Sequence, residues 1–218
     1  MKRNRVMETD QGIQEAATVA DYDLMQRNMR DKGWIETRIL LKKGIARGHA
    51  LEVGPGPGYL GLEWLRLTEG TRLTGLEISP AMIETARKNS RDYGLEGRAE
   101  YVLGNGRMLP FPADSFDAVF TNGSLHEWAD PVSTFKEMWR VLKNGGSLFV
   151  SDLRRDMSFL IRWFLWLTVK PKTMRPGLIT SLNAAYTADE IRDLARTSRI
   201  GECEITANPI GVVLTATK

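Results

Sequence analysis

The chain has 218 residues with 30 basic and 27 acidic side chains, a formal net charge of +3 and two histidines. This length suits one domain with a substantial core, and we expect residues 1–218 to form a single domain. The near balance of charges does not favour a nucleic-acid partner. The single cysteine, Cys203, excludes an intramolecular disulfide. One cysteine and two histidines predict no Cys/His metal site, and this usage fits a reducing, cytoplasmic compartment.

The N-terminal region begins with basic residues at positions 2–5 and continues with acids at positions 8–10. Because no apolar stretch follows the basic residues, the sequence predicts no signal peptide, and we expect a frayed tail here. Residues 14–47 then predict two helices, with a break near residues 31–33.

Residues 51–58, Leu-Glu-Val-Gly-Pro-Gly-Pro-Gly, join a predicted strand at 49–53 to a predicted helix at 59–68. Three glycines two residues apart allow a ligand to lie directly against the main chain. The helix that follows presents its free N–H groups and positive end to that ligand. Dinucleotide-binding turns have the pattern Gly-x-Gly-x-x-Gly, whose third glycine would fall at Tyr59. A nicotinamide cofactor is therefore disfavoured.

A second strand, at 71–77, ends in an acid and leads into a predicted helix at 80–93. Ser79 suits the N-cap of that helix, and Pro80 suits its first turn. Glu77 would sit where a nucleoside bound at the glycine turn places its ribose hydroxyls. Its carboxylate can accept hydrogen bonds from both hydroxyls.

The remaining elements alternate between strands and helices. The pattern predicts strands at 99–103, 115–121 and 146–151, helices at 131–143 and 187–197, and final strands at 202–207 and 210–217. Alternation of this kind predicts a parallel sheet with helices on both faces. The last two strands are joined by Asn208-Pro209, a connection short enough for an antiparallel hairpin.

Five segments in chain order match the motifs of a known family. They are the glycine turn with Glu52, the run Glu77–Met82, Gly-Asn-Gly at 104–106 before Leu-Pro-Phe-Pro at 109–112, the strand 116–120 leading to Leu-His-Glu-Trp at 125–128, and residues 137–146. On these residues the chain resembles the class I S-adenosylmethionine-dependent methyltransferases. Within them, it resembles the small-molecule group that includes the ubiquinone and menaquinone biosynthesis methyltransferases. The resemblance covers about residues 46–152 well.

The resemblance implies a three-layer, Rossmann-like α/β fold. Its seven-stranded sheet would have the order 3-2-1-4-5-7-6, with strand 7 antiparallel. The cofactor would be S-adenosylmethionine, and the product S-adenosylhomocysteine.

The resemblance also implies the residues of the cofactor site. They are Tyr22, Glu52, Gly54, Pro55, Gly56, Gly58, Glu77, Ile78, Met82, Asn105, Gly106, Arg107, Asn122 and Ser124. Glu52 would lie near the cofactor's amino group or only orient the glycine turn. Ile78 and Met82 would form apolar walls near the adenine, although both also suit an ordinary core. Tyr22 would either help to close the site or simply pack against it.

Asn105 replaces the aspartate that the family usually uses to accept a hydrogen bond from the adenine amino group. An asparagine carbonyl oxygen can do the same without the charge. The backbone N–H groups of Gly106 and Arg107 would reach the adenine ring, unless this segment is a turn that binds no ligand. Asn122 and Ser124 would line the methionine part of the cofactor.

His126 follows the fourth predicted strand, where the family's substrate and methyl group meet. A histidine can deprotonate an acceptor hydroxyl near neutral pH. Glu127 is the reserve candidate for this role, because the family often has a histidine here that is not a base. The loop at 121–124 reads Thr-Asn-Gly-Ser, which differs from the Asn/Asp-Pro-Pro-Tyr/Phe of nucleic-acid amino methyltransferases. Methylation of nucleic-acid bases is therefore disfavoured.

Residues 154–175 hold six basic residues and one acid around an apolar stretch at 159–169. That stretch is well short of the ~20 residues that a membrane-spanning helix requires. A helix that is apolar nearly all round must bury most of its surface, against the active site, another subunit or lipid. We favour a substrate cap over 154–186. A homodimer or membrane-surface contact through 157–169 is the alternative.

The favoured function is therefore methyl transfer from S-adenosylmethionine to a small hydrophobic or aromatic molecule, at oxygen or carbon. A second hypothesis is a non-catalytic S-adenosylmethionine-binding module whose apolar segment serves a protein or membrane-surface partner. A third is a nicotinamide oxidoreductase, which the glycine turn and the terminal hairpin argue against.

Overall fold

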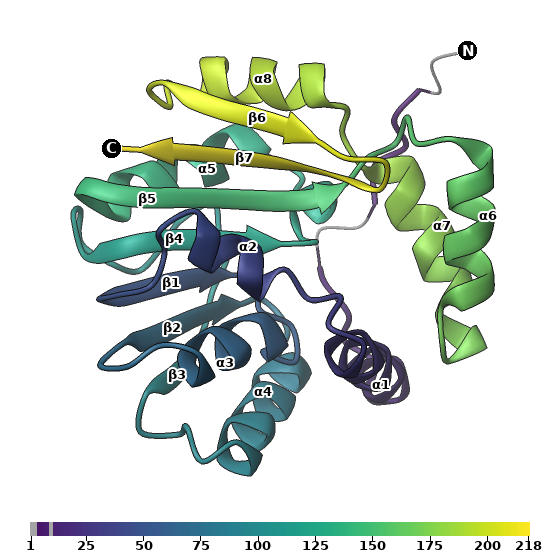
Figure 1. Cartoon of the computed structure of the whole chain (residues 1–218), viewed down its shortest axis with the longest axis horizontal. Helices are drawn as coiled ribbons and strands as arrows, with labels where there is room; N and C mark the ends of the chain where they lie inside the picture. The colour runs from purple at the N-terminus through teal and green to yellow at the C-terminus, as the bar shows by residue number, and fades with distance from the viewer. Residues whose placement is uncertain (1–3, 9–10) are drawn as a thin grey trace.

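The computed structural model describes residues 4–8 and 11–218. Its strands are β1 (His49–Val53), β2 (Arg72–Glu77), β3 (Ala99–Leu103), β4 (Phe116–Asn122), β5 (Leu142–Leu153), β6 (Cys203–Ala207) and β7 (Gly211–Thr217). Its helices are α1 (Ala16–Asp31), α2 (Thr37–Lys42), α3 (Tyr59–Arg66), α4 (Pro80–Asp92), α5 (Pro131–Val141), α6 (Phe159–Thr168), α7 (Arg175–Ala184) and α8 (Ala188–Thr197), with short 3₁₀ turns η1 (Leu125–Glu127) and η2 (Lys172–Met174). Figure 1 shows the strands one below another, from β6 at the top to β3 at the bottom.

The seven strands form one sheet in the order β3-β2-β1-β4-β5-β7-β6. β1 pairs in parallel with β2 on one side and with β4 on the other. β7 is antiparallel to both β5 and β6. The predicted fold class, strand order and antiparallel seventh strand are therefore confirmed. The chain reverses its direction of travel across the sheet between β1 and β4, and α/β folds bind ligands at this point.

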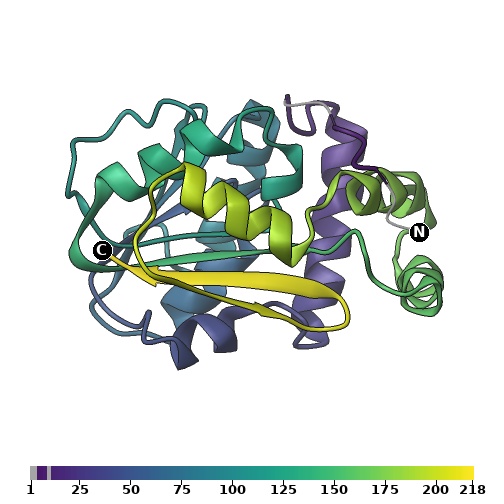
Figure 2. The ribbon, with the colours of Figure 1, turned by 90° about the horizontal axis from the view of Figure 1, so that it is seen from above.

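Each face of the sheet carries its own apolar core. On one face, Phe135 and Met138 of α5 and Ile191 of α8 are almost completely buried against the strands. On the other face, α2 and α3 pack on the same strands, and the ring of Trp64 lies edge-on to Phe120 with the centroids 5.9 Å apart. Figure 2 shows α8 and the β6–β7 hairpin from above. The helices packed on the two faces of the sheet fix the positions of the strands, including their carboxyl ends.

Local signals fix most helix starts where the sequence predicts them. Ser79 caps α4, since its Oγ accepts the N–H of Met82 at 3.3 Å. Thr187 and Glu190 form the predicted capping box of α8. The junction after α5 differs from the prediction, because the helix ends at Val141 and β5 already begins at the next residue. Leu142 already pairs with Phe116 at the start of β4, and the register of this strand pair shifts before the next pairing.

The segment predicted as a cap, 154–186, forms α6, η2 and α7 at the carboxyl edge of the sheet, beside α1 (Figure 1). α7 packs on η1, and α1 packs on η2. α6 packs on α7 but has no buried residue. The single chain therefore leaves much of the apolar surface of α6 exposed, and the expected cover by the active site, a subunit or lipid stays a prediction. Within the described residues, no helix combines the length and apolarity needed to cross a membrane.

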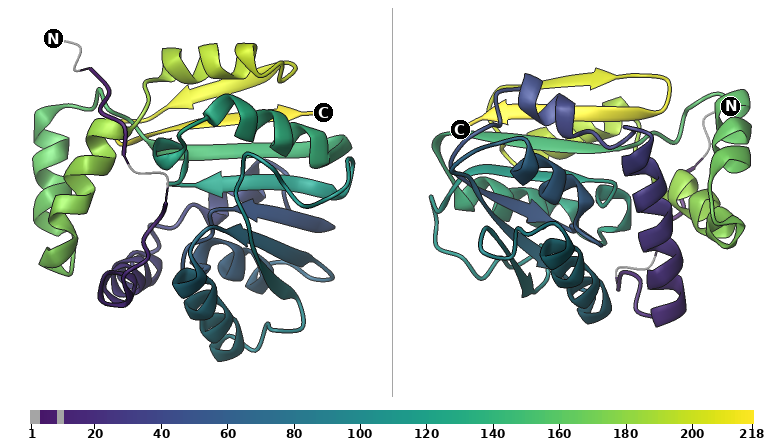
Figure 3. Two further views of the ribbon diagram at one scale, coloured as in Figure 1. Left: turned by 180° about the vertical axis from the view of Figure 1, so that it is seen from behind. Right: turned by 60° about the horizontal axis from the view of Figure 1, so that its bottom comes forward.

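The N-terminal residues 4–8 and 11–13, here called the N-terminal strap, are held against the domain. Arg5 donates from Nε to the carbonyl of Ala184 at 2.6 Å, and its guanidinium lies 4.1 Å from the centroid of the Tyr186 ring. Ser79 donates from Oγ to the carbonyl of Ile13 at 2.6 Å. The left view of Figure 3 shows this purple segment passing α7 on its way to α1. The predicted frayed tail is thus wrong for the strap, and positions 2 and 3 lie outside the described residues.

Candidate functional site

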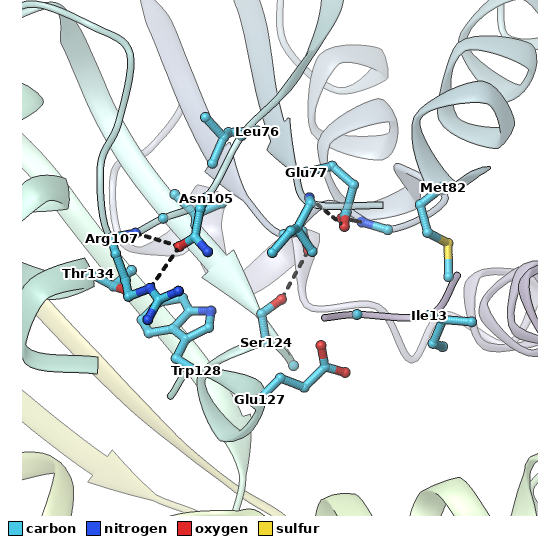
Figure 4. Close-up of a pocket in the computed structure, with 18 of the residues that line it drawn as sticks. Ile13, Leu76, Glu77, Met82, Asn105, Arg107, Ser124, Glu127, Trp128 and Thr134 are labelled. Atoms are coloured by element: carbon cyan, nitrogen blue, oxygen red, sulfur yellow. Dashed lines mark hydrogen bonds between the residues drawn. The ribbon is translucent and has the colours of Figure 1, made fainter. Parts of the chain in front are cut away.

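A pocket opens at the carboxyl ends of β1 to β4, at the point where the strand order reverses. It is lined by Gly12, Ile13, Tyr22, Val53, Gly54, Gly56, Leu76, Glu77, Ile78, Met82, Gly104, Asn105, Gly106, Arg107, Gly123, Ser124, Glu127, Trp128, Ala129 and Thr134. The ends of β1 and β2 and the loop after each of the four strands contribute, and the N-terminal strap, α1, α4 and α5 supply the remaining residues. In Figure 4, Asn105, Arg107 and Trp128 gather on one side of the pocket, and Met82 and Ile13 on the other.

The glycine turn leaves its main chain open to the pocket. Gly54 and Gly56 have φ values of +70° and +53°, in the left-handed region that favours glycine. A Cβ on Gly54 would run into the side chain of Ser124, whose Oγ donates to the Gly54 carbonyl at 3.0 Å. A Cβ on Gly56 would come within 3.4 Å of the Tyr22 ring. Larger residues here would therefore narrow the space that a ligand could use.

Glu77 ends β2 and binds the glycine turn directly. Its Oε2 accepts the N–H of Gly56 at 3.0 Å, and its Oε1 accepts the N–H groups of Ile78 and Ser79 at 2.9 and 3.0 Å. Burial raises the pKa of Glu77, although these backbone donors oppose the rise. Two carboxylate oxygens have about four acceptor sites, so the group retains capacity for a ligand hydroxyl.

Glu52 lies beneath the glycine turn and does not line the pocket. Its side chain is buried and accepts the backbone N–H of Gly61, while its Oε2 has no hydrogen-bond partner. The nearby Tyr101 hydroxyl is also buried without a partner. Burial raises the pKa of Glu52 to about 8. This carboxyl is therefore largely protonated at neutral pH.

The loop after β3 carries the predicted Gly-Asn-Gly segment to the pocket wall. Asn105 accepts the backbone N–H of Arg107 at its Oδ1, with a length of 3.0 Å. A Cβ on Gly106 would lie 2.9 Å from the Thr134 side chain and 3.3 Å from that of Val53. The glycine therefore lets this loop pack closely against α5 and β1.

His126 is buried behind the pocket and not among its lining residues. Its Nδ1 lies 2.8 and 3.0 Å from the two carboxylate oxygens of Asp152, which also accepts the His126 backbone N–H at 2.8 Å. Burial by itself would lower the pKa of His126, but Asp152, helped by two nearby glutamates, raises it to about 9. His126 is therefore protonated at neutral pH.

Glu127, the next residue, does line the pocket. Figure 4 shows its carboxylate projecting into the space between Ser124 and Ile13. Burial raises the pKa of Glu127 to about 7, against the lowering effect of the neighbouring His126. A carboxyl that titrates near neutral pH can both gain and lose a proton at the working pH of an enzyme.

Glu8 of the N-terminal strap completes this cluster. Its Oε2 lies 3.7 Å from His126 Nε2, and one oxygen accepts the Thr180 hydroxyl at 2.5 Å. Glu8, His126 and Glu127 each offer one ligand atom, and these atoms lie within 4.8 Å of one another. Such a set can hold a divalent cation when the histidine is neutral. Asp152 raises the pKa of His126, which favours its protonated form, and the absence of a metal site stays a prediction.

The structure brings most predicted site residues together. Eleven of the sixteen line the pocket, and the other five, Glu52, Pro55, Gly58, Asn122 and His126, do not. Asn122 instead donates from its side-chain amide to Glu36 Oε2 at 2.9 Å, and Gly58 caps α3 with a φ of +88°. Nine further lining residues were not predicted as site residues, and neither was Asp152 behind the pocket; the nine are Gly12, Ile13, Val53, Leu76, Gly104, Gly123, Trp128, Ala129 and Thr134. Asp152 lies near the carboxyl end of β5, next to β4 in the sheet, and its contact with His126, 26 positions away, has no signal in the local sequence.

Comparisons with known proteins match this geometry. Residues 51–150 match the family model of the methyltransferase domain. The chain is 29% identical over 148 residues to the demethylmenaquinone methyltransferase of Roseiflexus sp. (strain RS-1), covering 66% of this chain and 60% of that protein. It is 32% identical over 146 residues to the ubiquinone/menaquinone biosynthesis C-methyltransferase of Proteus mirabilis, covering 65% and 58% respectively. The chain thus spans about 60% of the length of these two curated relatives.

Solved structures share the whole fold. A candidate S-adenosylmethionine-dependent methyltransferase of Methanococcus maripaludis aligns with a TM-score of 0.73 at 22% identity, covering 100% of this chain and 97% of that one. A methyltransferase of Aquifex aeolicus aligns with a TM-score of 0.69 at 16% identity, covering 93% and 97%. At these identities the likeness concerns the fold alone. Together, the comparisons confirm the resemblance to class I methyltransferases and support an enzyme with S-adenosylmethionine as its cofactor.

Proposed function

We propose that the protein transfers a methyl group from S-adenosylmethionine to a small hydrophobic or aromatic molecule, at oxygen or carbon. The observation that carries this proposal is the pairing of two carboxyls in one pocket, with Glu77 buried and Glu127 half-buried. The carboxylate of Glu77 accepts the backbone N–H of Gly56 in the open glycine turn and those of Ile78 and Ser79. Glu127 projects into the same pocket with a pKa near neutral. The first suits a nucleoside, and the second suits proton transfer.

The pocket residues fit the cofactor. Glu77 would accept hydrogen bonds from the ribose hydroxyls, and Asn105 would accept one from the adenine amino group. Ile78 and Met82 would flank the adenine, and the open turn at 54–56 would lie against the methionine part. Glu52, whose Oε2 is buried without a partner, supports that turn from below. When bound, the cofactor supplies a methyl group on a sulfonium, which an aligned acceptor attacks in line.

The structure favours Glu127 over His126 as the proton acceptor. Methyl transfer to a hydroxyl oxygen, or to a ring carbon beside one, requires the acceptor to lose one proton. His126 is already protonated through its contact with Asp152 and does not line the pocket. Glu127 lines the pocket and has a pKa of about 7. We therefore assign the base to Glu127, and to His126 the role of a buried cation that keeps the Glu127 pKa near neutral.

A quinone-type acceptor is the first substrate class to test. The two relatives are named for demethylmenaquinone and for ubiquinone/menaquinone biosynthesis. Removing the hydroxyl proton of a reduced quinone places electron density on both the oxygen and the adjacent ring carbons, so either atom can accept the methyl group. Trp128 and Ile13 give the pocket apolar surface suited to an aromatic ring.

The experiment measures S-adenosylhomocysteine formation from labelled S-adenosylmethionine, with pools of reduced quinones, phenols and aromatic acids. We expect S-adenosylhomocysteine and a methylated acceptor to form in equal amounts. Calorimetry on the same protein should show that S-adenosylhomocysteine binds and NAD does not. Cofactor binding without turnover on any pool would favour the non-catalytic binding module, and tighter binding of NAD would overturn the cofactor assignment.

A further inference from the structure

We propose that α6 docks the protein on an anionic lipid bilayer. The contact surface, here called the α6 face, consists of Phe159, Leu160, Trp163, Phe164, Trp166 and Leu167, which are between 36% and 72% exposed. Four of the six are aromatic, and none is charged. Figures 1 and 2 show α6 at the outer edge of the molecule, away from the sheet.

The fold turns this face outward. The opposite side of α6 is fastened to α7, where Arg162 donates from Nη2 to Asn183 Oδ1 at 2.8 Å. Ile161 and Leu165 are only half-buried on that side, and Ser158 caps the helix start. The single charged side chain of the helix thus serves the internal contact. Among the described residues, the Trp166 ring contacts Arg175, and the six apolar side chains remain at least 36% exposed, so the arrangement is amphipathic with its apolar side facing outward.

The surrounding charges match an anionic surface. From residue 157 to residue 188 the chain has no aspartate or glutamate, while it has Lys170, Lys172 and Arg175 in addition to Arg162, which binds α7. The two lysines are exposed just beyond the C-terminal end of α6. The Arg175 guanidinium lies 4.0 Å from the centroid of the Trp166 ring. Each basic side chain near an anionic bilayer contributes about 1 kcal/mol of attraction.

The dimensions favour a bilayer surface over the alternatives. Ten residues form a helix of roughly 15 Å, about half the ~30 Å hydrocarbon thickness, so α6 would lie in the interface and not cross it. The α6 face offers on the order of several hundred Å², more than scattered surface residues do. A stable dimer requires roughly 800 Å² from each partner. Tryptophan and lysine side by side are typical of the headgroup region.

Docking would also orient the pocket. α7 packs on both α6 and η1, and η1 carries His126 and Glu127. A bilayer under α6 would therefore lie beside the site, and an acceptor dissolved in lipid could enter without crossing water. This consequence rests on the proposed function, whereas the docking itself does not.

Vesicle co-sedimentation tests the proposal with the full chain. We expect binding to phosphatidylcholine vesicles containing phosphatidylglycerol, and weaker binding to phosphatidylcholine alone. The double substitution Trp163→Ser and Phe164→Ser should weaken binding at least tenfold. Lys170→Gln with Lys172→Gln should weaken it only for the anionic vesicles. The matched control is Leu67→Ser, which alters an exposed leucine at the end of α3 and should leave binding unchanged.

Two further measurements separate the outcomes. Turnover of a water-soluble acceptor by the α6 double variant should equal that of the original chain, which shows that the fold and the pocket are intact. Vesicle binding that persists in the double variant, or is absent from the original chain, overturns the proposal. So does a dimer in sedimentation analysis that the double substitution abolishes, because the α6 face would then be a subunit contact.

Discussion

Glu77 binds three backbone N–H groups at the edge of the pocket, in addition to the ribose contact that the sequence predicts. It holds the N–H groups of Gly56, Ile78 and Ser79, so its loss would loosen the glycine turn as well as remove a ribose acceptor. Glu77→Ala should weaken S-adenosylhomocysteine binding by roughly 1.5 to 3 kcal/mol, measured by calorimetry. Glu84→Ala on the exposed side of α4 is the control. Equal affinities in both variants would show that another group holds the ribose.

Glu127 should govern the pH dependence of turnover. A base must be deprotonated, so the rate should rise with pH through an apparent pKa of about 7 and then level off. Glu127→Gln keeps the shape of the side chain but cannot accept a proton. It should lower kcat by about 10²- to 10⁴-fold with cofactor affinity little changed. A variant that retains most of its turnover would point to catalysis by alignment alone.

His126 should affect the same profile indirectly. The charge of His126 lowers the pKa of Glu127, so removing it raises that pKa. His126→Gln should therefore move the rising limb of the pH–rate profile to higher pH and restore much of the lost rate there. If His126 were itself the base, the rate would stay low at every pH. The two roles are thus separated by the shape of the profile, and Glu127→Gln provides the flat reference.

The residues that the sequence predicted well are those whose neighbours are close in the chain. The glycine turn and Glu77 each follow a strand directly, and parallel strands bring their carboxyl ends to one edge. Asp152 and Glu8 could not be recognised in the same way, since their link to His126 joins residues far apart in sequence. The sequence ranked His126 above Glu127 as the base, and the contact with Asp152 is the reason why the proposed base is Glu127. Asp152 stabilises the protonated form of the histidine, and only the folded chain shows that contact.

The N-terminal strap is an element that no local pattern indicated. It has neither helical nor strand periodicity, and its anchor joins Arg5 to Ala184, 179 positions away. Charged residues at a chain start normally remain solvated. Here the guanidinium also reaches the carbonyl of His126 at 3.1 Å, and the strap then supplies Gly12 and Ile13 to the pocket. The strap therefore couples the chain start to the site.

Arg5→Ala should loosen the strap and not the fold. The substitution removes two hydrogen bonds and the contact with the Tyr186 ring, each worth on the order of 1 kcal/mol. We expect S-adenosylhomocysteine to dissociate several-fold faster in stopped-flow measurements, with the melting temperature nearly unchanged. Arg38→Ala, at an exposed arginine of α2, is the control. An unchanged dissociation rate would mean that the strap does not close the pocket.

The sheet as a whole was predictable because strand–helix alternation indicates a parallel sheet and the family resemblance implies its strand order. What the pattern could not provide is the exposure of α6, because apolarity alone does not tell which surface covers a helix. The sequence pattern likewise does not show which polar groups are buried without a hydrogen-bond partner. Glu52 is an acid in an otherwise apolar strand, and only the packed structure reveals that its Oε2 has no partner.

That buried carboxyl makes the stability of the whole domain depend on pH. The pKa of Glu52 is about 8 in the folded protein, against 4.5 for the free side chain. As the pH rises, the unfolded chain releases this proton first, so the folded state holds more protons between these values. The contribution to stability is full below about pH 4.5 and is lost as the pH rises through about 8. His126 acts in the same direction between 6.5 and about 9.

We therefore expect the free energy of unfolding, measured by urea at a series of pH values, to fall between pH 5.5 and pH 8.5. The slope from Glu52 should be about 1 kcal/mol per pH unit. Glu52→Gln preserves the size of the side chain and the acceptor for Gly61 but removes the titration, so the fall should become shallower. Glu96→Gln, at an exposed position, controls for the substitution itself. A variant with the same slope as the original chain would show that Glu52 is ionised in the folded protein. Water would then have to reach the unpaired Oε2 of Glu52, and a charged carboxylate instead of a neutral carboxyl would lie beneath the glycine turn.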